Sequence, residues 1–174
     1  MNQEEWDQGE ERCEECGFVY HLDYAGMATR VLPALVEEMA ALLRTQGADL
    51  RARPEPEVWS PLEYGCHLRD VLLVQRERVL LARRVDRPEL TSMGRDERVE
   101  HDGYTSQEPE DVARQLSDAG LMFAGALSRL SPADWERVAL YPFPEPTPRA
   151  LAWVAVHTVH EARHHLMDVR RQLD

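Results

Sequence analysis

The sequence lacks lysine and isoleucine altogether and contains only three cysteines in 174 residues. Three thiols, Cys13, Cys16 and Cys66, are too few for a disulfide framework, and reduced thiols are typical of cytosolic proteins. No apolar run approaches the roughly 20 residues that a membrane-spanning helix needs. The N-terminus is acidic and lacks the apolar core of a secretory signal. These absences together predict a cytoplasmic protein.

Positive charge is also scarce, and all of it is arginine: 20 basic residues face 32 acidic ones, which gives a net charge of -12. Nucleic acids and anionic membranes attract basic surfaces, so this balance disfavours both as partners. The first 23 residues carry eight acidic residues and one arginine. We therefore expect an acidic N-terminal extension over residues 1–23, followed by a single domain over residues 24–174.

Helical patterns dominate the domain, and no segment shows a convincing strand alternation. The clearest start is Ser60-Pro61-Leu62-Glu63, a capping box with proline at the first helical position. Four long helices in a small domain predict an all-α fold, a four-helix bundle. The polar link 85–105 either crosses over the bundle or folds as a lid, and the proline-rich segment 141–148 is expected to be an extended connector. The predicted helices cover residues 24–45, 60–84, 106–130 and 147 to nearly the C-terminus, with Thr147 and Pro148 starting the last.

Four of the seven histidines lie within nine residues of the last helix: His157, His160, His164 and His165. A helical residue turns by about 100°, so His157, His160 and His164 share one stripe, whereas His165 leaves it. His160 and His164 are one turn apart, and their rings can converge on one metal ion. The alternative is that all four are surface histidines on an arginine-rich helix.

A third metal ligand should come from another helix, and His67 is the natural candidate. It lies two turns after the Ser60 cap, and Asp70 follows three residues later. A carboxylate near a ligating histidine often holds the other ring nitrogen, which is the role we expect for Asp70. The alternative for His67 is a core histidine bonded to a backbone carbonyl.

Two segments, Trp59 to Asp70 and His157 to Asp168, resemble the second and fourth helices of the DinB-like superfamily. That superfamily includes mycothiol-dependent maleylpyruvate isomerase and bacillithiol transferases, and the resemblance covers roughly residues 24–174. It implies an up-down-down-up four-helix bundle. It also implies a divalent metal, zinc first and nickel or iron as alternatives, held by His67, His160 and His164. His157 would lie one turn away, beside the ion or as an alternative ligand.

Three protein ligands leave a position open on the metal, as in catalytic zinc sites. A thiol bound there loses its proton and becomes a nucleophile. The leading hypothesis is therefore a metal-dependent S-transferase that uses a small-molecule thiol of the mycothiol type and an electrophilic substrate. A metal-dependent hydrolase at the same site is the second hypothesis. The third is a non-catalytic metal-binding bundle that acts through a homodimer or a protein partner.

The extension contains Cys13-Glu14-Glu15-Cys16, which departs from the better characterised enzymes of the superfamily. A single C-x-x-C is half of a zinc knuckle, and the sequence has no second C-x-x-C to complete it. The strand-then-helix setting of a thioredoxin-like redox pair is also missing. For Cys13 and Cys16 we therefore favour two thiols of unknown use, then a redox pair, and then metal binding.

Overall fold

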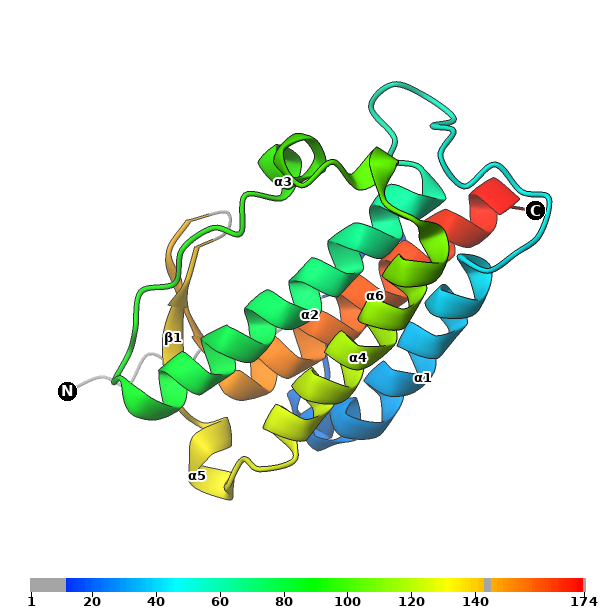
Figure 1. The fold of residues 1–174 in the computed structure, drawn as a ribbon. Helices are drawn as coiled ribbons and strands as arrows, with labels where there is room; N and C mark the ends of the chain where they lie inside the picture. The colour runs from blue at the N-terminus through cyan, green and yellow to red at the C-terminus, as the bar shows by residue number, and fades with distance from the viewer. Residues whose placement is uncertain (1–11, 143–144, 174) are drawn as a thin grey trace.

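The computed structural model describes residues 12–142 and 145–173. Its four long helices confirm the predicted all-α four-helix class (Figure 1). These helices are α1 (Ala28–Leu42), α2 (Pro61–Arg84), α4 (Pro109–Leu127) and α6 (Leu151–Leu173). The shorter elements are η1 (Leu22–Met27), α3 (Arg95–His101), η2 (Tyr104–Ser106), α5 (Pro132–Trp135), β1 (Val138–Tyr141) and β2 (Thr147–Ala150).

The helices follow the up-down-down-up order. Helices α1 and α6 run in one direction and α2 and α4 in the other (Figure 1). Each of α1 and α2 packs against both α4 and α6. Because α2 and α4 are parallel neighbours, the chain must return along the whole length of α2, about 36 Å, before α4 begins. The polar link after residue 84 makes this return and carries α3 and η2.

A short antiparallel hairpin, β1–β2, occupies the region where the sequence predicted an extended connector and then a helix. Its register pairs Leu140 with Pro148 and Tyr141 with Thr147. The last helix therefore begins at Leu151, and the predicted start at Thr147 was wrong. Strands of four residues are too short to show a clear alternation, and proline is tolerated in a strand that has a free edge.

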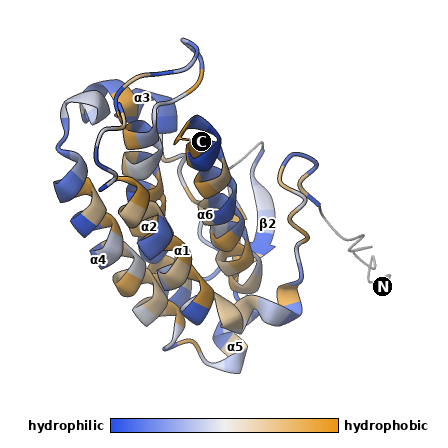
Figure 2. Cartoon of the chain, turned by 90° about the vertical axis from the view of Figure 1, so that its right-hand side faces the viewer, coloured by the Kyte–Doolittle hydropathy of each residue, from blue (hydrophilic) through white to orange (hydrophobic). Residues whose placement is uncertain are grey.

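The core lies between the four long helices, and each contributes fully buried side chains. Hydrophobic and hydrophilic positions are interspersed along the helices, as expected of amphipathic helices with one buried face (Figure 2). The packing of these apolar faces, rather than helix propensity alone, holds the helices in place. Representative core residues are Leu32, Leu68, Leu72, Leu116, Phe123, Leu151 and Leu166.

The predicted capping box at the start of α2 is present and is extended by an ion pair. The backbone N–H of Ser60 donates to Glu63 at 2.8 Å, and the Arg53 guanidinium donates to both carboxylate oxygens at 2.6 and 2.8 Å. Burial alone would raise the pKa of Glu63, but Arg53 and Ser60 outweigh it and lower that pKa. The cap therefore contributes most stability when Glu63 is ionised.

We expect Glu63→Gln to lower the free energy of unfolding by about 2 kcal/mol at pH 7, because a buried charge-assisted interaction is lost. The folded-state pKa of Glu63 lies below its ordinary value of 4.5, so this stabilisation is complete above that pH and is lost as the pH falls through the folded-state value. Urea unfolding at several pH values measures it. The exposed Glu57 provides the control, since Glu57→Gln should change little. If wild type and Glu63→Gln still differ in stability below both the folded-state and the unfolded-state pKa of Glu63, the ionised carboxylate is not the source of the stabilisation.

Candidate metal centre

Helix α6 presents Glu161 and His165 to His67 of α2. Glu161 and His165 are one turn apart, so their side chains share a face of the helix. Glu161 Oε2 lies 3.5 Å from Nε2 of His165 and 3.9 Å from Nε2 of His67. One donor atom from each of the three residues lies within 4.8 Å of the other two. We call these three residues the α2–α6 cluster.

The donor atoms of the α2–α6 cluster suit a divalent metal ion. Nε2 of His165 is buried and makes no hydrogen bond to any described residue. A buried polar atom without such a bond destabilises the fold, and a metal ion would satisfy it. Donors around a tetrahedral zinc ion are about 3.3 Å apart, and Oε2 of Glu161 lies 3.5 Å from Nε2 of His165 and 3.9 Å from Nε2 of His67. The Glu161 side chain is 24% exposed, so solvent reaches the cluster.

Asp168 holds the outer nitrogen of His165. Its Oδ2 lies 3.2 Å from Nδ1 of His165, an arrangement that leaves Nε2 directed toward Glu161. Burial alone would lower the pKa of His165, but Asp168 and Glu161 outweigh it and raise that pKa to about 9. Burial likewise acts to raise the pKa of Glu161, but His165 and His67 outweigh it and hold that pKa well below its usual range. Glu161 is therefore an ionised carboxylate at neutral pH.

The three predicted ligands are divided by this geometry. His67 lies with Glu161 and His165, whereas His160 and His164 lie with Cys13 and Cys16. Nδ1 of His160 is also 3.7 Å from Oε1 of Glu161. Both pairs on α6 have the same one-turn spacing, and the two differ by a rotation of about 100° around the helix. Sequence reasoning missed Glu161 and His165 because it read the histidine stripe and took His165 to lie outside it.

Asp70 does not hold the ring of His67, contrary to the prediction. Its Oδ1 accepts from Nε of Arg69 at 2.8 Å, and its Oδ2 accepts from the hydroxyl of Tyr104 at 2.7 Å and from Arg98 at 3.1 Å. His67 and Asp70 are one turn apart on α2 but contact different parts of the protein. His67 faces α6, and Asp70 binds Arg98 and Tyr104 of the return link.

His157 lies beside Glu161 of the α2–α6 cluster. Its ring stacks on Trp153 at 4.4 Å between centroids, and its Nδ1 is 3.0 Å from the hydroxyl of Tyr20. Its Nε2 is 3.8 Å from Oε1 of Glu161.

A second group brings both cysteines of the extension to α6. One donor atom from each of Cys13, Cys16, His160 and His164 lies within 4.8 Å of the others. We call these four residues the Cys–His cluster. The segment that carries the cysteines runs along the α6 side of the bundle, away from α4 (Figure 2). The third thiol, Cys66, is buried in the core beside Gln107.

The sequence profile of the DinB superfamily matches residues 27–169. The chain belongs to the DinB superfamily. The bundle is also similar in fold to a solved structure, YfiT from Bacillus subtilis, with a TM-score of 0.75 over 95% of this chain and 93% of that one, at 15% identity. YfiT is described as a probable metal-dependent hydrolase with an unusual four-helix bundle topology. No curated protein matches the sequence.

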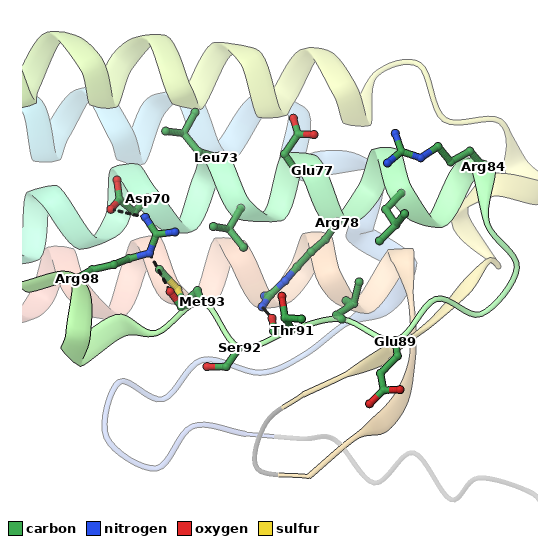
Figure 3. Close-up of a pocket in the computed structure, with 13 residues that line it drawn as sticks. Asp70, Leu73, Glu77, Arg78, Arg84, Glu89, Thr91, Ser92, Met93 and Arg98 are labelled. Atoms are coloured by element: carbon green, nitrogen blue, oxygen red, sulfur yellow. Dashed lines mark hydrogen bonds and ion pairs between the residues drawn. The ribbon is translucent and has the colours of Figure 1, made fainter. Parts of the chain in front are cut away.

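This DinB-superfamily chain also has a groove of about 470 Å³ between α2 and the return link. Asp70 and Arg98 lie at one end of the groove, and Arg84 and Glu89 lie toward the other (Figure 3). No residue of the α2–α6 cluster or the Cys–His cluster lines it. Within the described residues, no helix is long and apolar enough to cross a membrane.

Proposed function

We propose that this DinB-superfamily protein is a metal-dependent hydrolase whose metal ion is held by His67, Glu161 and His165. The observation that carries the proposal is that one donor atom from each of these three side chains lies within 4.8 Å of the other two, and that Nε2 of His165 is buried and makes no hydrogen bond among the described residues. Two histidines and one glutamate form the ligand set of several zinc hydrolases, in which a fourth position stays open for water or substrate. The description of YfiT supports the same reaction class.

A divalent ion at such a site supplies Lewis acidity, which lowers the pKa of a water molecule or thiol that binds it. The chain's own residues orient the ligands of the ion and transfer protons. Asp168 fixes the orientation of His165 through Nδ1. Nε2 of His157 faces the cluster, 3.8 Å from Oε1 of Glu161, and is placed to take up a proton from a water nucleophile and return it to the leaving group.

The thiol S-transferase expected from the family resemblance would use the same ion and a small-molecule thiol of the mycothiol type. The described residues show no feature that selects a thiol over water, so hydrolysis is the function proposed here. Zinc is the metal proposed for the site, with nickel and iron as alternatives. The substrate is proposed to be a small electrophile such as an ester, amide or lactone.

The test uses the Cys13→Ser/Cys16→Ser variant, in which the Cys–His cluster has lost both of its thiolates and the α2–α6 cluster is intact. We expect about one divalent ion per chain by elemental analysis and hydrolysis of one class in a panel of esters, amides and lactones. Chelation should abolish turnover, and one of zinc, nickel or iron should restore it.

A parallel assay adds a low-molecular-weight thiol and an electrophile and measures thiol consumption. Metal-dependent thiol consumption without hydrolysis would replace the proposal by the S-transferase. A metal-loaded protein with neither activity would favour the non-catalytic bundle.

A further inference from the structure

We infer that Cys13, Cys16, His160 and His164 form a second metal site, a closed structural zinc site that fastens the N-terminal segment to α6. The inference goes beyond the proposed hydrolase, because the Cys–His cluster shares no ligand with the α2–α6 cluster. Its first support is that four donors lie within 4.8 Å of one another.

The donor set is that of structural zinc. Two thiolates and two imidazoles around one ion, with the spacings C-x2-C and H-x3-H, fill all four tetrahedral positions. The C-x-x-C seemed incomplete in the sequence because its partner is not a second C-x-x-C. The fold supplies the other half as a histidine pair from the opposite end of the chain.

The cysteines lie on a tight turn that directs both toward α6. The backbone N–H of Gly17 donates to the carbonyl of Cys13 at 2.9 Å, and the N–H of Cys13 donates to the carbonyl of Phe18 at 2.8 Å. Gly17 has a φ of 68°, which other residues adopt only with strain. A bridge between Arg12 and Val19 closes the turn.

His164 is oriented for metal binding through its inner nitrogen. Nδ1 lies 3.6 Å from Sγ of Cys13. Nε2 faces two carboxylates, at 3.4 Å from Glu15 and 3.7 Å from Asp168. A carboxylate at one ring nitrogen fixes the proton there and leaves the lone pair of the other nitrogen for a metal.

His160 is oriented in the complementary way. Its Nδ1 lies 2.9 Å from the hydroxyl of Tyr20. Its Nε2 is buried and has no hydrogen-bond partner in residues 12–142 and 145–173. We assign this nitrogen as the fourth ligand, because a metal ion would satisfy an otherwise unpartnered buried atom.

The metal ion and its four ligands would have a net charge of zero. Zinc binding releases one proton from each thiol, and the two thiolates neutralise the dipositive ion while both histidines stay neutral. No electron is transferred. With no open position the ion is structural, and it holds Tyr20 against His157 and His160 beside the α2–α6 cluster.

The first test is spectroscopic. The reduced chain is loaded with Co²⁺, and thiolate-to-cobalt charge transfer should appear in the near ultraviolet with intense visible bands typical of tetrahedral cobalt. His165→Ala and Cys66→Ser should keep the charge-transfer band, whereas Cys13→Ser/Cys16→Ser should lose it. Absence of the band in the reduced, cobalt-loaded wild type would overturn the inference whatever happens to hydrolysis.

The second test counts metal and probes the segment. Wild-type chain should hold about one more zinc ion than Cys13→Ser/Cys16→Ser, and zinc should slow proteolysis between residues 12 and 27 at least about tenfold. His164→Ala should lose this protection, and the exposed His101→Ala should keep it. An unchanged zinc count in the double variant, with its helical circular dichroism intact, would contradict the site. If the protein shows no hydrolysis but has the extra zinc ion and the zinc-dependent protection from proteolysis, the Cys–His zinc site is still supported.

Discussion

His165→Ala is expected to abolish metal-dependent hydrolysis and to weaken metal binding at the α2–α6 cluster by about 100-fold or more. The estimate is a lower bound, because changing a group that merely supports a ligand already costs 10- to 100-fold in affinity. The substitution removes one of three donors and leaves Asp168 without the ring that it holds. Equilibrium metal titration and steady-state hydrolysis, both in the Cys13→Ser/Cys16→Ser background, measure the two losses.

His164→Ala in the same background decides between the structure and the prediction from the histidine stripe. If the catalytic ion is held by His67, Glu161 and His165, His164→Ala should keep most of the activity. If the ion is held by His67, His160 and His164, then His164→Ala should abolish hydrolysis and weaken metal binding by about 100-fold or more, as expected above for His165→Ala. His101→Ala is the control for the loss of a histidine far from both clusters.

Asp70→Ala is expected to lower the free energy of unfolding by about 3–5 kcal/mol, the range for removing one partner of a buried ion pair. The Asp70 side chain is 5% exposed and the Arg69 side chain 9% exposed, so the charge left on Arg69 cannot be fully solvated. The same substitution removes the acceptor of the buried Tyr104 hydroxyl. Urea unfolding monitored by circular dichroism gives the change directly.

The exposed Asp118→Ala provides the matched control and should change stability by less than about 0.5 kcal/mol. Asp70→Asn keeps the shape and one acceptor oxygen, so it should be destabilising but less so than alanine. If Asp70→Ala unfolds at the same urea concentration as the wild type, then Arg69 finds another partner and the role given to Asp70 is incorrect.

The bundle was predictable because its signals are local. Ser60, Pro61 and Glu63 form a cap whose bonds span three residues, and apolar spacing marks the helices. The hairpin was not predictable in the same way. Its strands are stabilised by pairing Leu140 with Pro148, a contact that neither segment reveals alone. A proline that looks like the first residue of a helix was instead an edge residue of a strand.

The order of residues along the chain was enough to show that His160 and His164 are one turn apart on α6, that His67 lies two turns into α2, and that two cysteines precede the bundle. Helix packing was needed to show that Glu161 and His165 form a second one-turn pair that faces His67, and that His160 and His164 face the N-terminal cysteines. A rotation of α6 by about 100° exchanges His160 and His164 for Glu161 and His165, and it leaves the helix equally well hydrogen-bonded. Packing of the apolar faces of α1, α2 and α6 sets that rotation. The same packing brings the N-terminal thiols to the histidines that α2 does not use.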